Sequence, residues 1–263
     1  MSLSLGTGPF GRAPAGAFNF DLAGAAPPHR IYFADFLPRV RAVIAEHTVL
    51  DTTRGKLLYE TGIMPRLYAP LEDFDGAVLS RTDHTTFCPF KGDASYWSLT
   101  VNGSTRENAL WAYEAPREEA AWLEGYACLY HEQPDEWWVE DERQRGHLRD
   151  PFHRIDILPS SRRVRIAAGE EVFADTDRAV LLFETGLPPR AYVPRADIRA
   201  AIDPSDKRTL CPYKGEARYW NVGGVADAAW SYEYPRPEST GIADHLAFDP
   251  ERVAVHIASD GAA

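Results

Sequence analysis

The stretch TFCPFKGDASYW at residues 86–97 returns as TLCPYKGEARYW at residues 209–220, and this duplication decides the fold. Other matches flank it in the same order, at residues 29–31 and 153–155, 60–70 and 184–194, and 111–114 and 230–233. Self-similarity of this length and order identifies a tandem repeat of one structural unit.

The repeat predicts three segments: an extension over residues 1–28, a first repeat domain over 29–150 and a second over 151–263. The join between the copies, WVEDERQRGHLRDP at residues 138–151, is strongly charged. Such a composition predicts a solvated linker or loop.

The extension is dominated by Gly, Ala and Pro, which favours irregular structure. It nevertheless carries Phe10, Phe18 and Phe20, which are able to anchor it on a domain surface. A docked arm and a free tail both remain open.

Each copy alternates short runs rich in Val, Leu, Tyr and Trp with turn residues about every 8–12 positions, as antiparallel sheet proteins do. Asn102-Gly103 and Gly223-Gly224 are hairpin signals, and residues 116–125 and 237–245 suit a short helix. We therefore predict a mainly β protein of two tandem small antiparallel β-sheet domains with one short helix each. The predicted strands are 39–44, 48–52, 56–60, 66–69, 95–101 and 109–113, with 163–167, 171–175, 179–183, 190–193, 218–222 and 228–232 in the second copy.

The composition is that of an ordinary globular protein of 263 residues, with 44% hydrophobic residues and a formal net charge of −11. That charge opposes non-specific binding to nucleic acid or to an anionic membrane, so neither is an expected partner. With no apolar run of about 20 residues and no leader-like start, the expected location is the cytoplasm. Three cysteines without a C-x-x-C pair predict no metal site, and no cofactor is identified.

Cys88 and Cys211 occupy the same place in both copies and are the candidate catalytic residues. A thiol three residues from an ammonium group can be activated as a nucleophile. The alternative is that each thiol packs as a small apolar side chain beside a proline-containing turn. Cys128 has no such counterpart, because Ala247 falls at its place. Whether the chain is an enzyme stays open.

Lys91 and Lys214 are predicted to hold an anionic group, with the following glycine letting backbone N–H groups approach it. The spacing of a phosphate-binding P-loop is absent, and Lys-Gly is also a common turn. His84 is a candidate base or metal ligand in the first copy only, because Lys207 stands at its place in the second. We favour a solvated loop residue there.

Other recurring side chains are charged residues beside apolar strands and aromatic residues at strand spacing. Because a buried charge needs a partner, Arg and Glu are expected to form an ion pair or to line a polar pocket. The aromatic side chains are expected to wall a ligand pocket or to fill the core. The candidate ligand-binding residues are Arg54, Glu60, Arg66, Lys91, Tyr96, Trp97, Arg178, Glu184, Arg190, Lys214, Tyr219 and Trp220.

The motifs at residues 178–194, 209–220 and 229–232 resemble the domain of unknown function 427 family, which carries a nucleotidyltransferase-like label. The resemblance covers both copies. It implies a fold similar to the β-tent group, whose zinc-binding members use paired C-x-x-C motifs that this chain lacks. The label implies nucleotide binding, although no acidic pair has the spacing that metal-dependent transfer needs.

These patterns lead to a ligand hypothesis and two alternatives. Each copy is expected to bind a small anionic or nucleotide-like molecule at its Cys-Pro-aromatic-Lys-Gly loop. The alternatives are a noncatalytic interaction module, in which the repeated residues serve folding, and a cysteine-dependent enzyme. Because two copies in one chain mimic a symmetric dimer, the expected state is a monomer with a pseudo-two-fold repeat.

Overall fold

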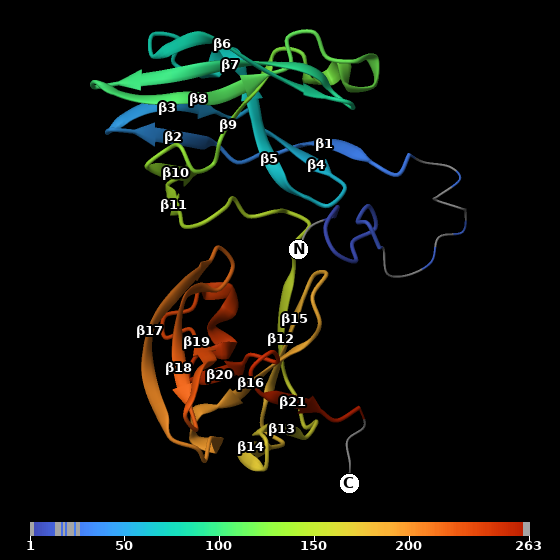
Figure 1. Cartoon of the computed structure of the whole chain (residues 1–263), viewed down its shortest axis with the longest axis vertical. Helices are drawn as coiled ribbons and strands as arrows, with labels where there is room; N and C mark the ends of the chain where they lie inside the picture. Colours follow the sequence, from blue (N-terminus) through green and yellow to red (C-terminus); the bar gives the residue numbers. More distant parts are fainter. Residues whose placement is uncertain (1–2, 14–16, 18, 20–23, 25–26, 260–263) are drawn as a thin grey trace. The chain divides into compact units, whose positions relative to one another are not determined.

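The chain divides into two compact units, each built mainly from antiparallel strands (Figure 1). One unit is Pro9–His147, and the other is Leu148–Ala263 together with Met1–Gly8. This architecture confirms the mainly β prediction. The computed structural model describes residues 3–13, 17, 19, 24 and 27–259.

The first unit contains a seven-stranded sheet of order β1-β4-β5-β9-β8-β7-β6 and a four-stranded sheet of order β11-β10-β2-β3. Its strands are β1 (Ile31–Asp35), β2 (Val40–Ile44), β3 (His47–Thr52), β4 (Lys56–Glu60), β5 (Ile63–Pro70), β6 (Leu79–Cys88), β7 (Gly92–Val101), β8 (Ser104–Ala112), β9 (Tyr126–Leu129), β10 (Glu136–Val139) and β11 (Glu142–Gln144).

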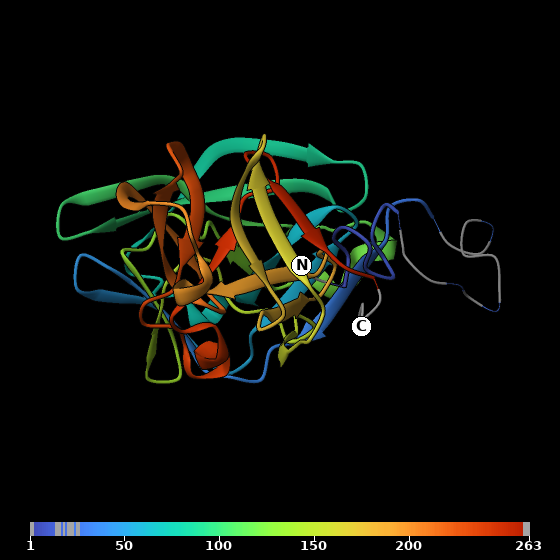
Figure 2. The ribbon, with the colours of Figure 1, turned by 90° about the horizontal axis from the view of Figure 1, so that it is seen from below.

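The second unit repeats the large sheet in the order β12-β15-β16-β20-β19-β18-β17 and adds a three-stranded sheet of order β14-β13-β21. The red β21 pairs with the yellow β13, as Figures 1 and 2 show. The strands are β12 (Ile155–Pro159), β13 (Val164–Ala168), β14 (Glu171–Thr176), β15 (Val180–Glu184), β16 (Arg190–Pro194), β17 (Ile202–Cys211), β18 (Gly215–Val222), β19 (Val225–Ser231), β20 (His245–Phe248) and β21 (Ala254–Ile257).

The large sheet of the second unit has a different core on each face. Because neighbouring side chains in a strand point to opposite faces, Tyr219 and Trp220 separate. Trp220 joins the cluster that contains Val164 and Phe173 of the small sheet. Tyr219 lies against the opposite cluster, beside Cys211. We call the second of these the aromatic face, and the first unit has its own aromatic face around Tyr96 and Cys88.

Two turn predictions are confirmed. Asn102 and Gly103, between β7 and β8, have φ values of 48° and 78°, and Gly223 and Gly224, between β18 and β19, have 55° and 77°. Positive φ at both central residues is what a two-residue hairpin turn requires.

The predicted short helices are present as 3₁₀ segments, η2 (Glu118–Leu123) and η4 (Pro237–Ile242). Each unit also has a three-residue 3₁₀ turn, η1 (Leu71–Asp73) and η3 (Arg195–Asp197). In the described residues no helix is long and apolar enough to span a bilayer.

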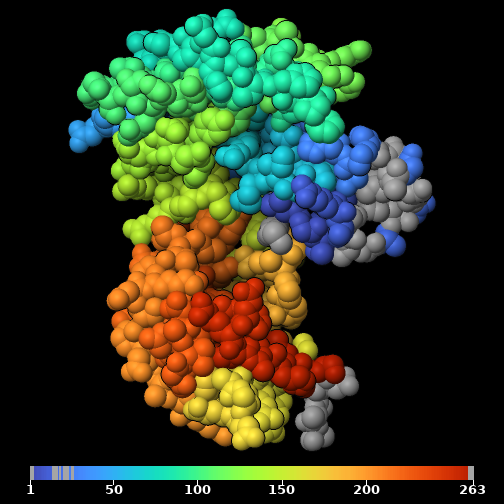
Figure 3. Space-filling model, viewed as in Figure 1, coloured from blue at the N-terminus to red at the C-terminus, as the bar shows by residue number. Residues whose placement is uncertain are grey.

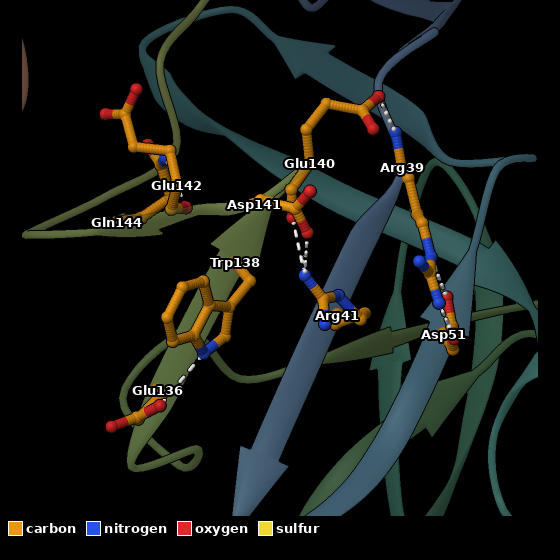
Figure 4. A network of polar contacts seen from close by, with 9 residues as sticks. All are labelled: Arg39, Arg41, Asp51, Glu136, Trp138, Glu140, Asp141, Glu142 and Gln144. Atoms are coloured by element: carbon orange, nitrogen blue, oxygen red, sulfur yellow. Dashed lines mark hydrogen bonds and ion pairs between the residues drawn. The ribbon is translucent and has the colours of Figure 1, made fainter.

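The charged join between the copies is not simply a loop, because part of it forms the hairpin of β10 and β11. β10 pairs with β2, and Arg41 donates to the Glu140 carbonyl at 2.7 Å and to Asp141 at 2.9 Å (Figure 4). The Arg41 guanidinium also lies 5.7 Å from the Trp138 ring centroid. The β10–β2 ladder therefore attaches this hairpin to the sheet, and the charged contacts lie on its surface.

Several strands were not predicted from the sequence. β6 is the longest of them in the first unit, and most of its side chains are exposed, as its teal surface in Figure 3 illustrates. A strand exposed in this way has no apolar alternation to reveal it. The strands missed were β1, β6, β9, β10, β11, β12, β17, β20 and β21.

Part of the N-terminal extension docks on the first unit. The Phe10 carbonyl accepts a hydrogen bond from Thr61 Oγ1 at 2.9 Å, and the Gly11 carbonyl accepts one from Arg30 at 2.9 Å. Phe18 and Phe20 lie outside the described residues.

Candidate functional site

The first unit contains a buried ion pair built from the recurring motifs. Glu60 ends β4, and Lys91 lies in the turn between β6 and β7, 31 positions further along the chain. Lys91 Nζ lies 2.5 Å from Glu60 Oε2, and both side chains are 8% exposed. His29 Nε2 lies 3.1 Å from the other carboxylate oxygen. Both oxygens of Glu60 are therefore occupied within the domain.

The second unit repeats this arrangement. Lys214 Nζ lies 2.6 Å from Glu184 Oε2, and His153 Nε2 lies 3.0 Å from Glu184 Oε1. Burial by itself would raise the pKa of Glu184, but the contacts with His153 and Lys214 outweigh it and lower this pKa to about 2. The carboxylate is thus held ionised beside its two partners.

The motif turn explains how the lysine becomes buried. Pro89 follows Cys88, whose carbonyl accepts from the Lys91 N–H at 3.3 Å, as in a four-residue turn with proline second. Gly92 then has a φ of +103° and Gly215 one of +105°, a region that only glycine enters without strain. The Lys91 carbonyl accepts from the Arg117 N–H at 3.0 Å. The glycine therefore shapes a turn that packs against the start of η2.

Two expectations about charge need correction. The partner of Glu60 and Glu184 is a lysine, so the expected Arg–Glu pair is wrong. Lys91 and Lys214 are buried and already neutralised, so their ammonium groups do not face solvent, where an incoming anion would meet them.

The two candidate thiols lie at the edge of the aromatic face. Cys88 and Cys211 are half-buried and free, each at the end of an edge strand. Among the described residues, neither thiol has a hydrogen-bonded side chain that could act as its base. Burial raises the pKa of Tyr113, and proximity to Cys88 adds to the effect, so the phenol beside this thiol stays protonated. In the second unit, burial likewise raises the pKa of Tyr232, and proximity to Cys211 contributes to the rise.

Aromatic side chains with polar groups cover the rest of this face. Trp111 Nε1 donates to Tyr68 Oη at 3.1 Å, and the Tyr96 and Thr86 hydroxyls are 2.9 Å apart. The Trp111 and Tyr130 rings lie with centroids 4.3 Å apart. Burial is the main cause that raises the pKa of Tyr130 to about 12, and a hydrogen bond with Tyr96 adds to it. Neutral hydroxyl groups on aromatic rings are available here to donate or accept hydrogen bonds.

One recurring cation on this face is not neutralised. Arg66 and Arg190 are half-buried, and neither has an acidic partner within ion-pair distance in the described part of the chain. The Arg190 guanidinium carbon lies 5.0 Å from the Trp230 ring centroid, and its Nη1 donates to the Phe248 carbonyl at 3.2 Å. Arg66 lies two positions before Tyr68 on β5 and therefore points to the same face of the sheet.

The other recurring arginines are surface residues. Arg54 contacts Asp73 and lies 2.7 Å from Glu72, and Arg178 contacts Asp197. These pairs fasten the segment after β3 or β14 to the following 3₁₀ turn, and do not join the lysine–glutamate cluster.

Strand alternation also separates the predicted Tyr-Trp pairs. Tyr96 and Tyr219 lie on the aromatic face. The Trp97 ring centroid lies 5.8 Å from the guanidinium carbon of Arg81, and the Trp220 ring centroid lies 4.2 Å from that of Arg195. The two tryptophans are therefore not in the candidate site.

His84 is exposed, and its ring lies edge-on to the ring of Tyr96, with the two ring centroids 4.5 Å apart. Within the described residues, no three His, Cys, Asp or Glu side chains gather as metal ligands would. The residues missed by the sequence predictions are His29 and His153. Their signal was present, because they begin the first matched segment of the repeat.

A family model described as a domain of unknown function, DUF427, matches residues 34–140 and again residues 156–259. The chain therefore belongs to this family and carries the domain twice. Compared with curated proteins, the chain has no match.

Proposed function

We propose that this two-copy member of the DUF427 family binds a small anionic, nucleotide-like ligand on the aromatic face of each unit, beside the Cys-Pro-aromatic-Lys-Gly turn. The observation that carries the proposal is Arg66 with its counterpart Arg190. Each is a half-buried, recurring cation on this face with no acidic partner among the described residues. An arginine in that state offers a planar, multi-donor contact for phosphate or carboxylate.

The aromatic neighbours suit the remainder of such a ligand. Tyr130 and Trp230 are half-buried and offer rings on which a nucleobase can stack, an interaction that tolerates any base. The exposed hydroxyls of Thr86 and Thr209, next to those of Tyr96 and Tyr219, supply polar contacts at the rim. In this arrangement the cysteine forms part of the wall.

The lysine has a structural role in the proposal. Its charge is used by the buried glutamate, so it positions the turn and the strand ends around the face. The net charge of −11 makes a local cation more important, because the protein as a whole repels anions.

Isothermal titration calorimetry with mononucleotides, dinucleotides and small dicarboxylates tests the proposal. The Arg66→Ala, Arg190→Ala double variant should bind any hit about tenfold or more weakly, the usual effect of losing a charged hydrogen bond. The matched control is Arg54→Ala with Arg178→Ala, which removes two recurring arginines from surface ion pairs and should leave affinity unchanged. Equal losses in the two variants, or no binding of any panel member by the intact protein, contradict the proposal.

A noncatalytic interaction module is the second candidate. It is favoured by the saturation of each buried glutamate within its own domain. Thiol alkylation separates both candidates from a cysteine-dependent enzyme. Slow labelling of Cys88 and Cys211 in the native protein, with Ser variants that lose only stability, excludes thiol chemistry. Rapid labelling whose rate increases with pH, with a midpoint well below the pKa of about 8.5 of an ordinary thiol, supports thiol chemistry.

A further inference from the structure

A pocket lies in the first unit, between β1, the start of β4 and η2. Its volume is about 490 Å³, within the range of small-molecule sites. Its walls are mostly aromatic, and Trp122 and Tyr32 remain 39% and 43% exposed. The lining residues are Ile31, Tyr32, Phe33, Lys56, Trp122 and Tyr126.

Two of the aromatic rings lie beside one cation, and a third stacks on the first of them. Phe33 and Trp122 stack with centroids 4.9 Å apart, and Phe33 and Tyr126 meet edge-to-face at 5.3 Å. Lys56 Nζ lies 5.6 Å from the Phe33 centroid and 6.0 Å from that of Tyr126. The pocket therefore combines flat apolar walls with one fixed positive charge.

In the described part of the second repeat, most positions that correspond to this lining carry different side chains. The strand registers place Ile157 where Phe33 stands and Val180 where Lys56 stands. In the helix, Gly241 replaces Trp122. A Cβ atom on Gly241 would lie 2.8 Å from Ile157 Cγ2, so Ile157 packs directly against the helix backbone and fills this place.

The charge in the pocket is available to a ligand. Lys56 pairs with Asp35, whose side chain is 68% exposed, while that of Lys56 is 27% exposed. An ion pair this exposed contributes little to stability, so exchanging the Asp35 carboxylate for a ligand anion costs little. In the second repeat the same two positions hold Pro159 and Val180, so the ion pair and the aromatic walls occur together in one copy and are absent together from the other.

We propose that this pocket is a binding site for a planar aromatic acid. The ring of the acid stacks against Trp122, and its carboxylate replaces Asp35 at Lys56. The site differs from the proposed ligand site that recurs in both units, because Phe33, Lys56 and Trp122 are replaced by Ile157, Val180 and Gly241 in the second one.

Calorimetry of the full chain with 1-naphthoate, and with neutral 1-naphthamide as the companion probe, tests the assignment. Trp122→Gly should weaken naphthoate binding about tenfold or more, the usual effect of losing an aromatic stacking partner. Lys56→Val should weaken naphthoate about tenfold and leave naphthamide nearly unchanged. Both substitutions introduce the residue that the second repeat carries at the same place, which that domain accommodates.

Two controls separate this pocket from other aromatic and cationic sites. Lys207→Val removes a lysine that lies 4.2 Å from the Tyr219 ring in the second unit and should not change naphthoate binding. The Arg66→Ala, Arg190→Ala variant should also bind naphthoate normally, whatever its effect on nucleotides. Wild-type affinity in Trp122→Gly and Lys56→Val, or no binding of naphthoate by the intact chain at millimolar concentration, overturns the proposal.

Discussion

Lys91 and Lys214 are cations whose charge is paired inside the fold and is not presented at the surface. Removing two charges from water is costly, and their attraction compensates only when the remaining hydrogen bonds are satisfied. Here His29 and His153 occupy the second glutamate oxygen. The sequence predicted that these lysines and glutamates matter but not that they pair, because strand register brings them together from distant parts of the chain.

Replacing only the lysine should reduce the stability of a unit much more than replacing the lysine and its glutamate partner together. We expect Lys214→Met to reduce the stability of the second unit by about 3–5 kcal/mol, because the Glu184 carboxylate stays buried without its cation. Adding Glu184→Leu should restore most of the loss. Urea denaturation measures both effects, and the exposed Lys207→Met, expected to stay within about 0.5 kcal/mol, is the control. A double variant no more stable than the single one would contradict the ion-pair account.

The pKa of Glu184 predicts an acid limit for the second unit. Because its folded pKa of about 2 is below the ordinary 4.5, its stabilising contribution is complete above pH 4.5 and is lost as pH falls toward 2. The Glu184→Gln variant lacks this stabilising contribution, so its free energy of unfolding at neutral pH should be lower than that of the wild type. Stability curves of the variant and the wild type should therefore converge between about pH 4.5 and 2. Parallel curves over that interval would show that Glu184 does not titrate with folding.

At the scale of elements, the turns were easier to predict than the strands between them. Asn102-Gly103 marked its hairpin correctly, because few residue types accept positive φ. β6 and β17 were missed, because both are exposed edge strands whose side chains lack alternation. In the join, the charged composition predicted a loop, yet backbone pairing with β2 makes part of it a hairpin.

The same reasoning isolates the glycine of the motif turn. Gly92→Ala should destabilise the first unit by about 1–3 kcal/mol, because alanine at a φ of +103° is strained. Gly76 is the matched control in the same unit, since a Cβ atom added there would meet no other atom within 4 Å and its φ is ordinary. Thermal unfolding of both variants compares them. Equal stabilities would mean that the backbone at Gly92 relaxes.

At the scale of the whole molecule, the sequence predicted the tandem repeat. It did not predict the structural effect of the sequence differences between the two copies. Matching segments fixed the two copies, and the structure finds a large sheet with the same strand order in each. The pocket at Trp122 depends on several substitutions that are far apart in the sequence. Their effect on one surface is visible only once β1, β4 and η2 are placed together.

Two compact units with separate cores predict two separable unfolding events in the intact chain. Every strand ladder among the described residues stays within one unit. We therefore expect Lys91→Met to lower the denaturation midpoint of one transition and Lys214→Met that of the other, measured by hydrogen exchange resolved along the sequence. A loss of protection in both units from either substitution would instead show a single cooperative block.

The buried lysine–glutamate pair also has an evolutionary consequence. A lineage that loses either partner first passes through a protein with an uncompensated buried charge, which for a marginally stable domain approaches the threshold of folding. Apolar replacement is accessible only when both codons change nearly together. The pair therefore resists removal even though it has no part in the proposed ligand contacts, and its presence in both copies needs no functional reason beyond this.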